Sequence, residues 1–368
     1  MEVEHLGRLG KEEIYRLTLR PVAYSPVKGD LRECTAVDAT LKVGKAAAPP
    51  RGGDRVLLIV SRPEFRTGLQ PFVRWKRQEG YTVRELYVST HQRDSVKAAM
   101  RPWFDNASPV TPAPEYILLV GDAAQLQSFI GSTGLNGESH TTDLPYADFT
   151  NDYLPDAMLG RWPVNDTAEL RIVVEKTLRY EQFDNIDTAQ LERMLLVAGE
   201  EDAGQALLTT NSQVSYVSRE VKLAHPEMDT ITYHNPESGT LLDSIKADIG
   251  RGASLLNYTA HCTVGGWTMP SLSIGQVEET AGNQPMVYVN NCCKSNTFSG
   301  TGFGEQLLRL PVGGAVGVIG ATNSTLWLED YFWAAGPKWP ISPDNSYDSL
   351  TRGAFDALAG RRPTATTL

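Results

Sequence analysis

A histidine and two adjacent cysteines follow short apolar runs, and these residue types can perform nucleophilic catalysis. His261 comes shortly after residues 254–258 (SLLNY), and Cys292 and Cys293 come shortly after residues 286–289 (MVYV). A thiol is a weak nucleophile until it loses its proton, and an adjacent imidazole lowers the thiol pKa. If the two runs are neighbouring strands, the sulfur and the imidazole face each other at the edge of one sheet.

This pattern alone leaves other interpretations open. A lone histidine near a strand end is often a structural or surface residue, and a cysteine on a strand is often a small buried hydrophobe. Zinc is disfavoured because adjacent cysteines do not easily bind one tetrahedral ion together. The sequence contains no G-x-S-x-G elbow and no Walker-type phosphate loop. Gly300, Gly302 and Gly304 lack the dinucleotide-binding spacing, so we expect them to let the loop behind the thiols turn.

The elements that would position these side chains alternate between strand and helix. Short apolar strands are predicted at residues 56–60, 82–88, 116–120, 194–198, 230–233, 254–258, 286–289 and 315–319. Helices are predicted at residues 65–78, 94–104, 167–183 (with Asp166 as N-cap), 204–224, 240–249, 304–310 and 348–358. Such alternation indicates an α/β fold with parallel sheets covered on both faces. The chemistry of these sheets lies beyond the carboxyl ends of the strands, where His261 and the two cysteines follow.

The first fifty residues have a different pattern. Residues 15–24 and 31–43 are predicted to be two strands around a turn at residues 25–30, and residues 46–53 (AAAPPRGG) have the composition of a linker. The segment is therefore expected to be a β-hairpin or the end of an upstream β-domain. The predicted domains are a β-rich lead-in at 1–48, one α/β subdomain at 54–185 and a second at 186–368.

Composition and charge exclude several classes of protein. Acidic residues outnumber basic ones by 44 to 34, and the sequence has no dense run of Lys and Arg, so nucleic acid is not an expected partner. No apolar run approaches the roughly 18 residues of a membrane-spanning helix. The first residues show no signal peptide, which fits a cytoplasmic protein or a piece of a longer secreted precursor.

Four acidic residues lie in the loop-rich stretch between the predicted strands of the first subdomain. They are Asp143, Asp148, Asp152 and Asp156, and their spacing is not that of an EF-hand. We expect a solvated loop here, with a structural calcium site as the alternative.

Five ordered runs resemble the gingipain-type cysteine peptidases of clan CD. They are residues 56–63 (VLLIVSRP), 117–122 (ILLVGD), 159–162 (LGRW), 257–267 (NYTAHCTVGGW) and 285–298 (PMVYVNNCCKSNTF). The resemblance implies a caspase-like fold of two side-by-side, mostly parallel-sheet subdomains with helices on both faces, the second carrying the catalytic residues. The segment YRLTLRPVAYSPVKGDL is also similar to the β-rich lead-in of the type IX secretion sortase branch of this family.

The resemblance assigns the catalytic pair but leaves the nucleophile with two candidates. His261 matches the family histidine. Counting forward from Pro285 places the family cysteine at Cys292, whereas counting back from Phe298 places it at Cys293. We prefer Cys292, because the register of a strand is harder to shift than the length of a loop.

Other residues receive roles from the same resemblance. The backbone N–H groups of Cys262 and Cys292 would form the oxyanion hole, although Cys262 replaces the family glycine and adds a Cβ close to the substrate. Glu200 matches an acid that orients the histidine, and Trp327 matches an aromatic that lines the substrate pocket. Alternatively, Glu200 is a solvated acid after a strand, and Trp327 is a core residue. Asn211 lies where gingipains carry a pocket acid, and a neutral amide does not neutralise a cationic side chain, so strong Arg or Lys specificity is not expected.

The resemblance therefore implies a cysteine endopeptidase that hydrolyses polypeptides through a Cys–His dyad and an acyl-thioester, with no cofactor for the chemistry. It also implies an extracellular or cell-surface location and a chain that normally continues further. A transpeptidase of a type IX secretion system is one alternative. An inactive caspase-like scaffold is another, motivated by Cys262 and by the one-residue insertion near Cys292. Fold class alone leaves a nucleotide-binding or oxidoreductase protein as a third.

Overall fold

The computed structural model describes most of the chain. The described residues are 2–9, 12–18, 22–25, 28–33, 55–108, 110–131, 137–151, 155–184, 186–199, 204–235, 240–280, 284–298, 300–336, 340–345 and 353–358. They fall into two compact units, Met1–Arg51 and Gly52–Leu368. No helix within these ranges is both long enough and apolar enough to cross a membrane.

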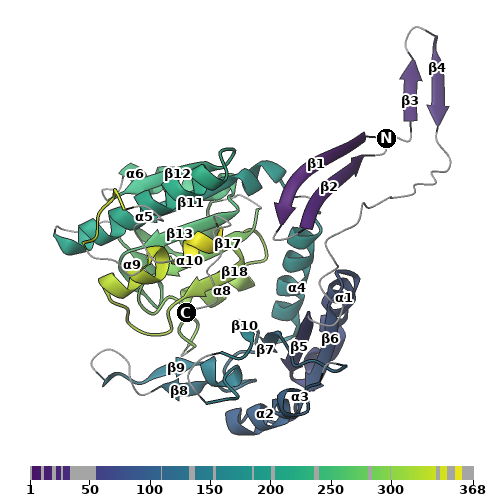
Figure 1. Cartoon of the computed structure of the whole chain (residues 1–368), viewed down its shortest axis with the longest axis vertical. Helices are drawn as coiled ribbons and strands as arrows, with labels where there is room; N and C mark the ends of the chain where they lie inside the picture. The colour runs from purple at the N-terminus through teal and green to yellow at the C-terminus, as the bar shows by residue number, and fades with distance from the viewer. Residues whose placement is uncertain are drawn as a thin grey trace. The chain divides into compact units, whose positions relative to one another are not determined.

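The N-terminal unit consists of two antiparallel strand pairs (Figure 1). They are β1 (Glu2–Leu9) with β2 (Glu12–Thr18), and β3 (Val22–Ser25) with β4 (Asp30–Glu33). The second pair confirms the predicted hairpin turn. The single strand predicted over residues 15–24 is wrong, because β2 ends at Thr18 and pairs with β1, whereas β3 begins at Val22 and pairs with β4. Residues 34–43 of the predicted return strand lie outside the described residues.

The first sheet of the larger unit has four parallel strands in the order β10-β7-β5-β6. Its strands are β5 (Val56–Ser61), β6 (Thr82–Tyr87), β7 (Tyr116–Val120) and β10 (Met158–Trp162). Its helices are α1 (Arg66–Gln78), α2 (Arg93–Met100), α3 (Pro102–Asp105) and α4 (Thr167–Glu181), with short 3-10 turns at Pro63–Phe65 and Leu144–Tyr146. A hairpin of β8 (Phe129–Gly131) and β9 (His140–Thr142) accompanies them.

Helices cover both faces of this sheet because alternate side chains of a strand point to opposite faces. Leu57 and Ile59 of β5 join a buried cluster with α1 and α4, whereas Leu58 and Val60 join a second cluster with α2. Helix α4 begins as predicted, since the Asp166 carboxylate accepts hydrogen bonds from two backbone N–H groups of its first turn. The helix predicted over residues 94–104 is divided into α2 and α3 at a proline.

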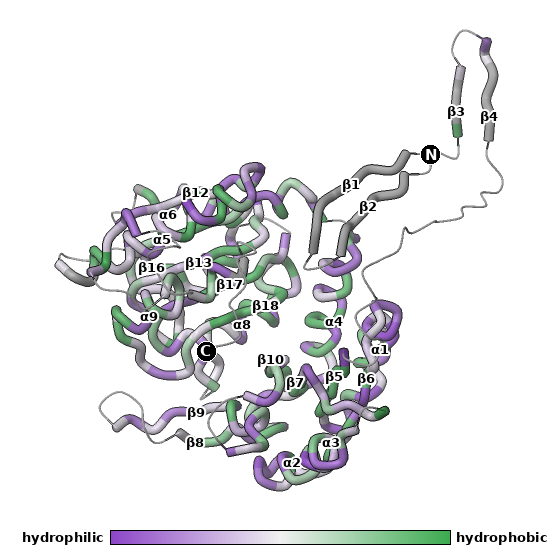
Figure 2. The backbone as a smooth tube through the Cα atoms, viewed as in Figure 1, coloured by the Kyte–Doolittle hydropathy of each residue, from purple (hydrophilic) through white to green (hydrophobic). Residues whose placement is uncertain are grey.

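The second sheet has five parallel strands in the order β12-β11-β13-β17-β18. Its strands are β11 (Arg193–Ala198), β12 (Asp229–His234), β13 (Leu255–Thr259), β17 (Met286–Asn291) and β18 (Ala315–Gly320), and hydrophobic residues run along β17 and β18 (Figure 2). Its helices are α5 (Gln205–Ala224), α6 (Thr240–Arg251), α7 (Ile274–Glu278), α8 (Phe303–Arg309), α9 (Trp327–Ala335) and α10 (Ala354–Leu358), with a 3-10 turn at Thr188–Glu192.

Two buried clusters again show that helices cover both faces of the second sheet. One cluster joins β13 and β17 to α6, α7 and α8, and the other joins β11 and β17 to α5, α9 and α10. A small antiparallel sheet of β14 (Cys262–Thr263), β15 (Gly266–Thr268) and β16 (Ser271–Ser273) follows β13. The α/β fold with two parallel sheets is therefore confirmed, and the predicted boundary at residues 185/186 falls between the two sheets.

Basic side chains join the two sheets where α4 contacts α8. The buried Lys176 amine of α4 donates hydrogen bonds to the carbonyl oxygens of Leu307 (3.2 Å) and Leu310 (2.8 Å) at the end of α8. Arg309 of α8 pairs with Asp122, which follows β7, at 2.8 Å and also donates to the Pro163 carbonyl. Hydrogen bonds to the last carbonyls of α8 thus hold this helix, which directly follows the loop of the two cysteines.

Replacing Lys176 with methionine should change how stability depends on pH. Burial lowers the pKa of Lys176 from 10.5 to about 7. Between pH 7 and 10.5 the Lys176 amine is protonated in the unfolded chain and neutral in the folded protein. The free energy of unfolding of the wild type should therefore rise with pH relative to that of Lys176→Met, by up to about 1.4 kcal/mol per pH unit. Urea unfolding at pH 7, 8.5 and 10 measures this difference. Exposed Lys222→Met is the control, and parallel curves for wild type and Lys176→Met would contradict the assignment.

Candidate active site

The ladder between β13 and β17 brings the predicted histidine and cysteines to one edge of the second sheet. These strands are parallel neighbours, and their last paired residues are Thr259 and Asn291. His261 lies two residues after Thr259, and Cys293 lies two residues after Asn291. His261 and Cys293 therefore lie at equivalent positions beyond the ends of two neighbouring strands.

The backbone of His261 is held by two hydrogen bonds. Its carbonyl oxygen accepts from the Tyr258 hydroxyl and from the Thr268 N–H, both at 3.0 Å. Its exposed imidazole packs edge-on against Trp327, with ring centroids 4.7 Å apart and an interplanar angle of 73°. The indole therefore limits where the imidazole can lie.

Cys292, the preferred nucleophile, is part of a disulfide bond. Its sulfur is bonded to that of Cys262, and their Cα atoms are 5.3 Å apart. The side chain is fully buried, and the Cys292 N–H donates to the Asn290 carbonyl at 2.9 Å. Cys292 therefore offers neither a thiol nor an unengaged N–H, which runs against its predicted roles as nucleophile and as oxyanion donor. The sequence could not reveal this pairing, because it depends on the nearness of two strand ends.

Among the described residues, Cys293 is the cysteine with a free thiol. Its side chain is partly exposed, and its sulfur accepts a hydrogen bond from the Thr325 N–H at 3.3 Å. The carbonyl and hydroxyl oxygens of Thr325 each lie 3.7 Å from the same sulfur.

The Cys262 N–H is not used by the neighbouring strand β15. Cys262 pairs with Trp267, and the hydrogen bond from Thr268 to the His261 carbonyl makes this a non-hydrogen-bonded pair of the antiparallel ladder. Backbone donors with this freedom can stabilise an oxyanion. The Cys262 side chain is in the disulfide, and the role of its N–H as an oxyanion donor stays a prediction.

A buried polar layer supports the ends of both strands. The Gln213 side-chain oxygen, on α5, accepts from the Thr259 hydroxyl (3.3 Å) and from the Asn291 amide (3.2 Å). On the other face, the Trp267 indole N–H donates to the Asn290 side chain at 2.9 Å. The supporting role of these side chains was not predicted from the sequence. The signal that could have found them is the polar pair Asn290-Asn291 at the end of an apolar strand.

The loop after Cys293 packs tightly on α8. The Gly304 N–H donates to the Ser295 carbonyl at 3.0 Å, and a Cβ at residue 304 would overlap the Asn296 side chain. Gly300 has a φ of 81°, in the region that favours glycine. The prediction that these glycines let the loop turn is confirmed at Gly300, while Gly304 is needed for close approach.

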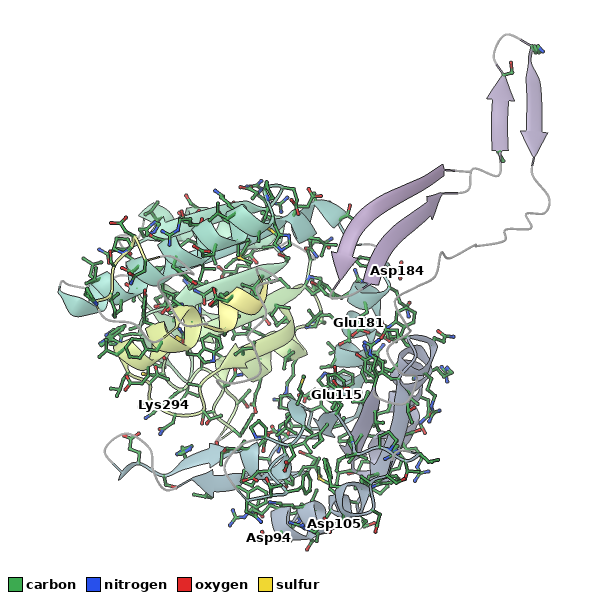
Figure 3. The ribbon with its side chains drawn as sticks, viewed as in Figure 1. Asp94, Asp105, Glu115, Glu181, Asp184 and Lys294 are labelled. Carbon is green, nitrogen blue, oxygen red and sulfur yellow. A yellow bond between two sulfur atoms is a disulfide. The ribbon has the colours of Figure 1, made fainter. Side chains whose placement is uncertain are left out.

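The same loop contacts the β8–β9 hairpin, which accompanies the first sheet. Lys294, labelled in Figure 3, lies 3.4 Å from the Glu138 carboxylate. The Phe298 N–H donates to the Thr141 hydroxyl at 3.3 Å. The segment after the thiol is therefore shared between the two subdomains.

The remaining predicted residues differ in how they are placed. Asn211 lies on α5, and its side-chain oxygen is buried without a hydrogen-bond partner in the described part of the chain. Glu200 lies outside the described residues. Trp327 contacts the imidazole, and its role towards substrate stays a prediction.

The loop acids are engaged within the protein. Asp143 pairs with the buried Arg161 at 2.7 Å, and Asp156 accepts from the Phe149 N–H at 2.6 Å. Asp148 accepts from the Asn151 N–H at 2.6 Å, and Asp152 lies outside the described residues. No cluster of three or more metal-binding side chains occurs among the described residues, and calcium binding stays untested.

Comparison with known proteins places this chain in a family. Residues 52–366 match the model of peptidase family C25. Lys-gingipain W83 of Porphyromonas gingivalis is 26% identical over 409 aligned residues, which include 97% of this chain, and gingipain R2 of the same species is 24% identical over 74% of this chain. The chain spans about a fifth (22%) of the length of that Lys-gingipain.

Solved structures agree with the family match. A structure described as a protease has a TM-score of 0.74 at 25% identity, with 83% of this chain and 67% of that chain covered. The crystal structure of the Arg-specific cysteine proteinase gingipain R has a TM-score of 0.62 at 21% identity, with 77% and 66% covered, and shares the fold. Because the family model matches most of the chain, this protein belongs to peptidase family C25, the gingipain family of cysteine peptidases.

Proposed function

We propose that this protein is a cysteine endopeptidase in which Cys293 is the nucleophile and His261 the base. The shared position of these two residues beyond the β13–β17 ladder carries the proposal. Among the described residues, Cys293 is the cysteine with a free thiol, and its sulfur accepts a hydrogen bond from the Thr325 backbone N–H.

The proposed reaction follows from this arrangement. His261 takes the proton of the Cys293 thiol, and the sulfur attacks the carbonyl carbon of a peptide bond. The N–H groups of Cys262 and Cys293 stabilise the oxyanion that forms. The imidazolium then gives its proton to the leaving amine as the C–N bond breaks, and water hydrolyses the resulting thioester.

The two departures from the family sequence are joined to each other. By the resemblance to the gingipain-type peptidases, Cys262 stands where the family has glycine, and one residue is inserted between Pro285 and Phe298, the stretch that holds Cys292 and Cys293. Their disulfide ties the residue after the histidine to the residue before the nucleophile. This bond supports an intact site over a decayed scaffold, because both changes contribute to one cross-link that fixes the spacing of the proposed dyad.

The substrate is proposed to be a polypeptide, in keeping with family C25 membership. Hydrolysis is proposed over transpeptidation, and both would use the same thioester. An extracellular or cell-surface location belongs to the same proposal. A disulfide beside the site is in keeping with an oxidising compartment, where such bonds persist.

A peptidyl thiol-directed probe should label Cys293 and no other cysteine. We expect Cys293→Ala to abolish labelling and the Cys262→Ala/Cys292→Ala double variant to retain it. His261→Ala should slow labelling and peptide hydrolysis by a factor on the order of 10²–10⁴, with His225→Ala as the control. Mass spectrometry of the labelled peptide identifies the site. Equal labelling of all cysteines, or labelling that survives His261→Ala at full rate, would refute the dyad.

The disulfide should stabilise the folded protein. Cys262 and Cys292 are 30 residues apart, and closing such a loop in the unfolded chain is worth about 3–4 kcal/mol. The Cys262→Ala/Cys292→Ala variant should lose this amount in urea unfolding without reductant, and wild type with a strong reductant should approach the variant. A Cys34→Ser variant is the control. Unchanged unfolding in both experiments would show that the bond does not form in solution.

Glu200→Gln tests whether this acid orients the histidine. If it does, kcat/KM for a peptide substrate should fall about tenfold or more, because the imidazolium loses its supporting charge. Glu201→Gln, at the neighbouring position, should leave activity near wild type. Equal effects of the two substitutions would remove Glu200 from the proposed site.

A further inference from the structure

Asp330 is a buried carboxyl next to the candidate nucleophile that the proposed reaction does not use. It lies on α9 and is 8% exposed. None of the described Lys, Arg or His side chains forms an ion pair with it, and the Thr325 hydroxyl donates a hydrogen bond to its carboxylate at 2.8 Å. Its backbone carbonyl accepts from the Asn291 side chain at 3.0 Å, which ties α9 to the end of β17.

Thr325 connects this carboxyl to the sulfur of Cys293. Its N–H donates to the sulfur at 3.3 Å, and its hydroxyl oxygen lies 3.7 Å from the same sulfur. A hydroxyl has a single proton to donate. The Thr325 proton can therefore be directed either to the Asp330 carboxylate or to the Cys293 sulfur.

The charge of Asp330 decides between these two directions. An ionised carboxylate attracts the hydroxyl proton, which leaves the sulfur without this donor and places a negative charge near it. A neutral carboxyl can donate its own proton to the Thr325 oxygen, so that the hydroxyl proton is free to stabilise a thiolate. Both effects of ionisation oppose the thiolate.

The surroundings of Asp330 allow both states near neutral pH. Burial raises its pKa to about 7, the Thr325 hydrogen bond acts in the lowering direction, and the negative charge of Glu329 on the same helix raises it. Charged groups on the helices packed against α9 are engaged elsewhere. On α5, Arg219 bonds to Glu220 and to the Pro343 carbonyl, and on α10, Asp356 accepts from the Tyr216 hydroxyl.

We propose that Asp330 is a positioning residue that acts on Cys293 through the Thr325 hydroxyl, so that loss of the Asp330 proton makes the sulfur hold its own proton more tightly. The inference rests on the proposed function in taking Cys293 as the reactive thiol. It extends that function by adding a second titrating group to the pH dependence of the site.

The test measures the rate at which iodoacetamide alkylates Cys293 between pH 5 and 10, read by mass spectrometry of the Cys293 peptide. Wild type and Asp330→Asn should react alike below about pH 6, where Asp330 is protonated. At pH 7–8 Asp330→Asn should react several-fold faster, because the variant has no negative charge near the sulfur and does not draw the Thr325 hydroxyl proton away from it. The rates should meet again at high pH. A purely structural role of Asp330 would not produce a difference confined to this window.

Two Thr325 variants separate the hydroxyl from the charge. In Thr325→Ser, which keeps the hydroxyl, Asp330→Asn should have its full effect. In Thr325→Val, which removes it, the effect should shrink by half or more. Exposed Glu329→Gln is the charge control and should move the profile less than Asp330→Asn.

Superimposable profiles of folded wild type and Asp330→Asn would overturn the proposal, as would an undiminished effect in Thr325→Val. Folding is checked by the melting temperature of each variant. Alkylation needs no peptidase activity, so the two proposals fail separately. A pH-dependent effect of Asp330→Asn without peptide hydrolysis would count against the peptidase proposal, and hydrolysis with superimposable profiles would count against the role of Asp330.

Discussion

The hydrogen-bond ladder between β13 and β17 fixes the site, because it determines which residues lie opposite each other where the two strands end. Leu256 and Tyr258 enter the core on one face of the sheet, and Leu255 and Val289 enter it on the other. A slip of one residue would exchange these faces, and each buried side chain contributes about 1.5–3 kcal/mol. The spacing of the proposed dyad is thus maintained by side chains that take no part in the chemistry.

The site also depends on polar groups that the core must satisfy. Gln213 contacts both strand ends from one face, and Trp267 reaches Asn290 from the other. Buried polar side chains are costly unless hydrogen-bonded, so these contacts restrict the strand ends to few arrangements. Beside the Cys293 sulfur, Thr325 and Asp330 form a second polar group. Its Asp330 carboxyl can gain or lose a proton near neutral pH, whereas the amide and hydroxyl side chains beneath the strands do not titrate. The strand ends are therefore held in one arrangement, while the charge of the carboxyl beside the sulfur changes with pH.

Much of the fold was predictable because buried parallel strands are continuous apolar runs, as in β5, β7 and β13. The edge strand β10, with Gly160 and Arg161, was missed because it lacks such a run. At the site, the sequence identified His261 and two candidate cysteines but preferred Cys292. The preference for Cys292 did not take the disulfide into account. The spacing of cysteines along the chain does not show that Cys262 and Cys292 lie close together in the folded protein. Asp330 was missed for the same reason, since its link to the sulfur passes through Thr325.

The disulfide also constrains how this branch of the family can have evolved. A lineage that acquired Cys262 alone would place an unpaired thiol near the proposed nucleophile, and a lineage that acquired Cys292 alone would bury one beside it. Either intermediate would expose the site to mispaired sulfur chemistry, because neighbouring thiolates exchange readily with disulfides. The two cysteines should therefore be inherited or lost together, which makes them a paired marker for recognising the relatives that share this arrangement.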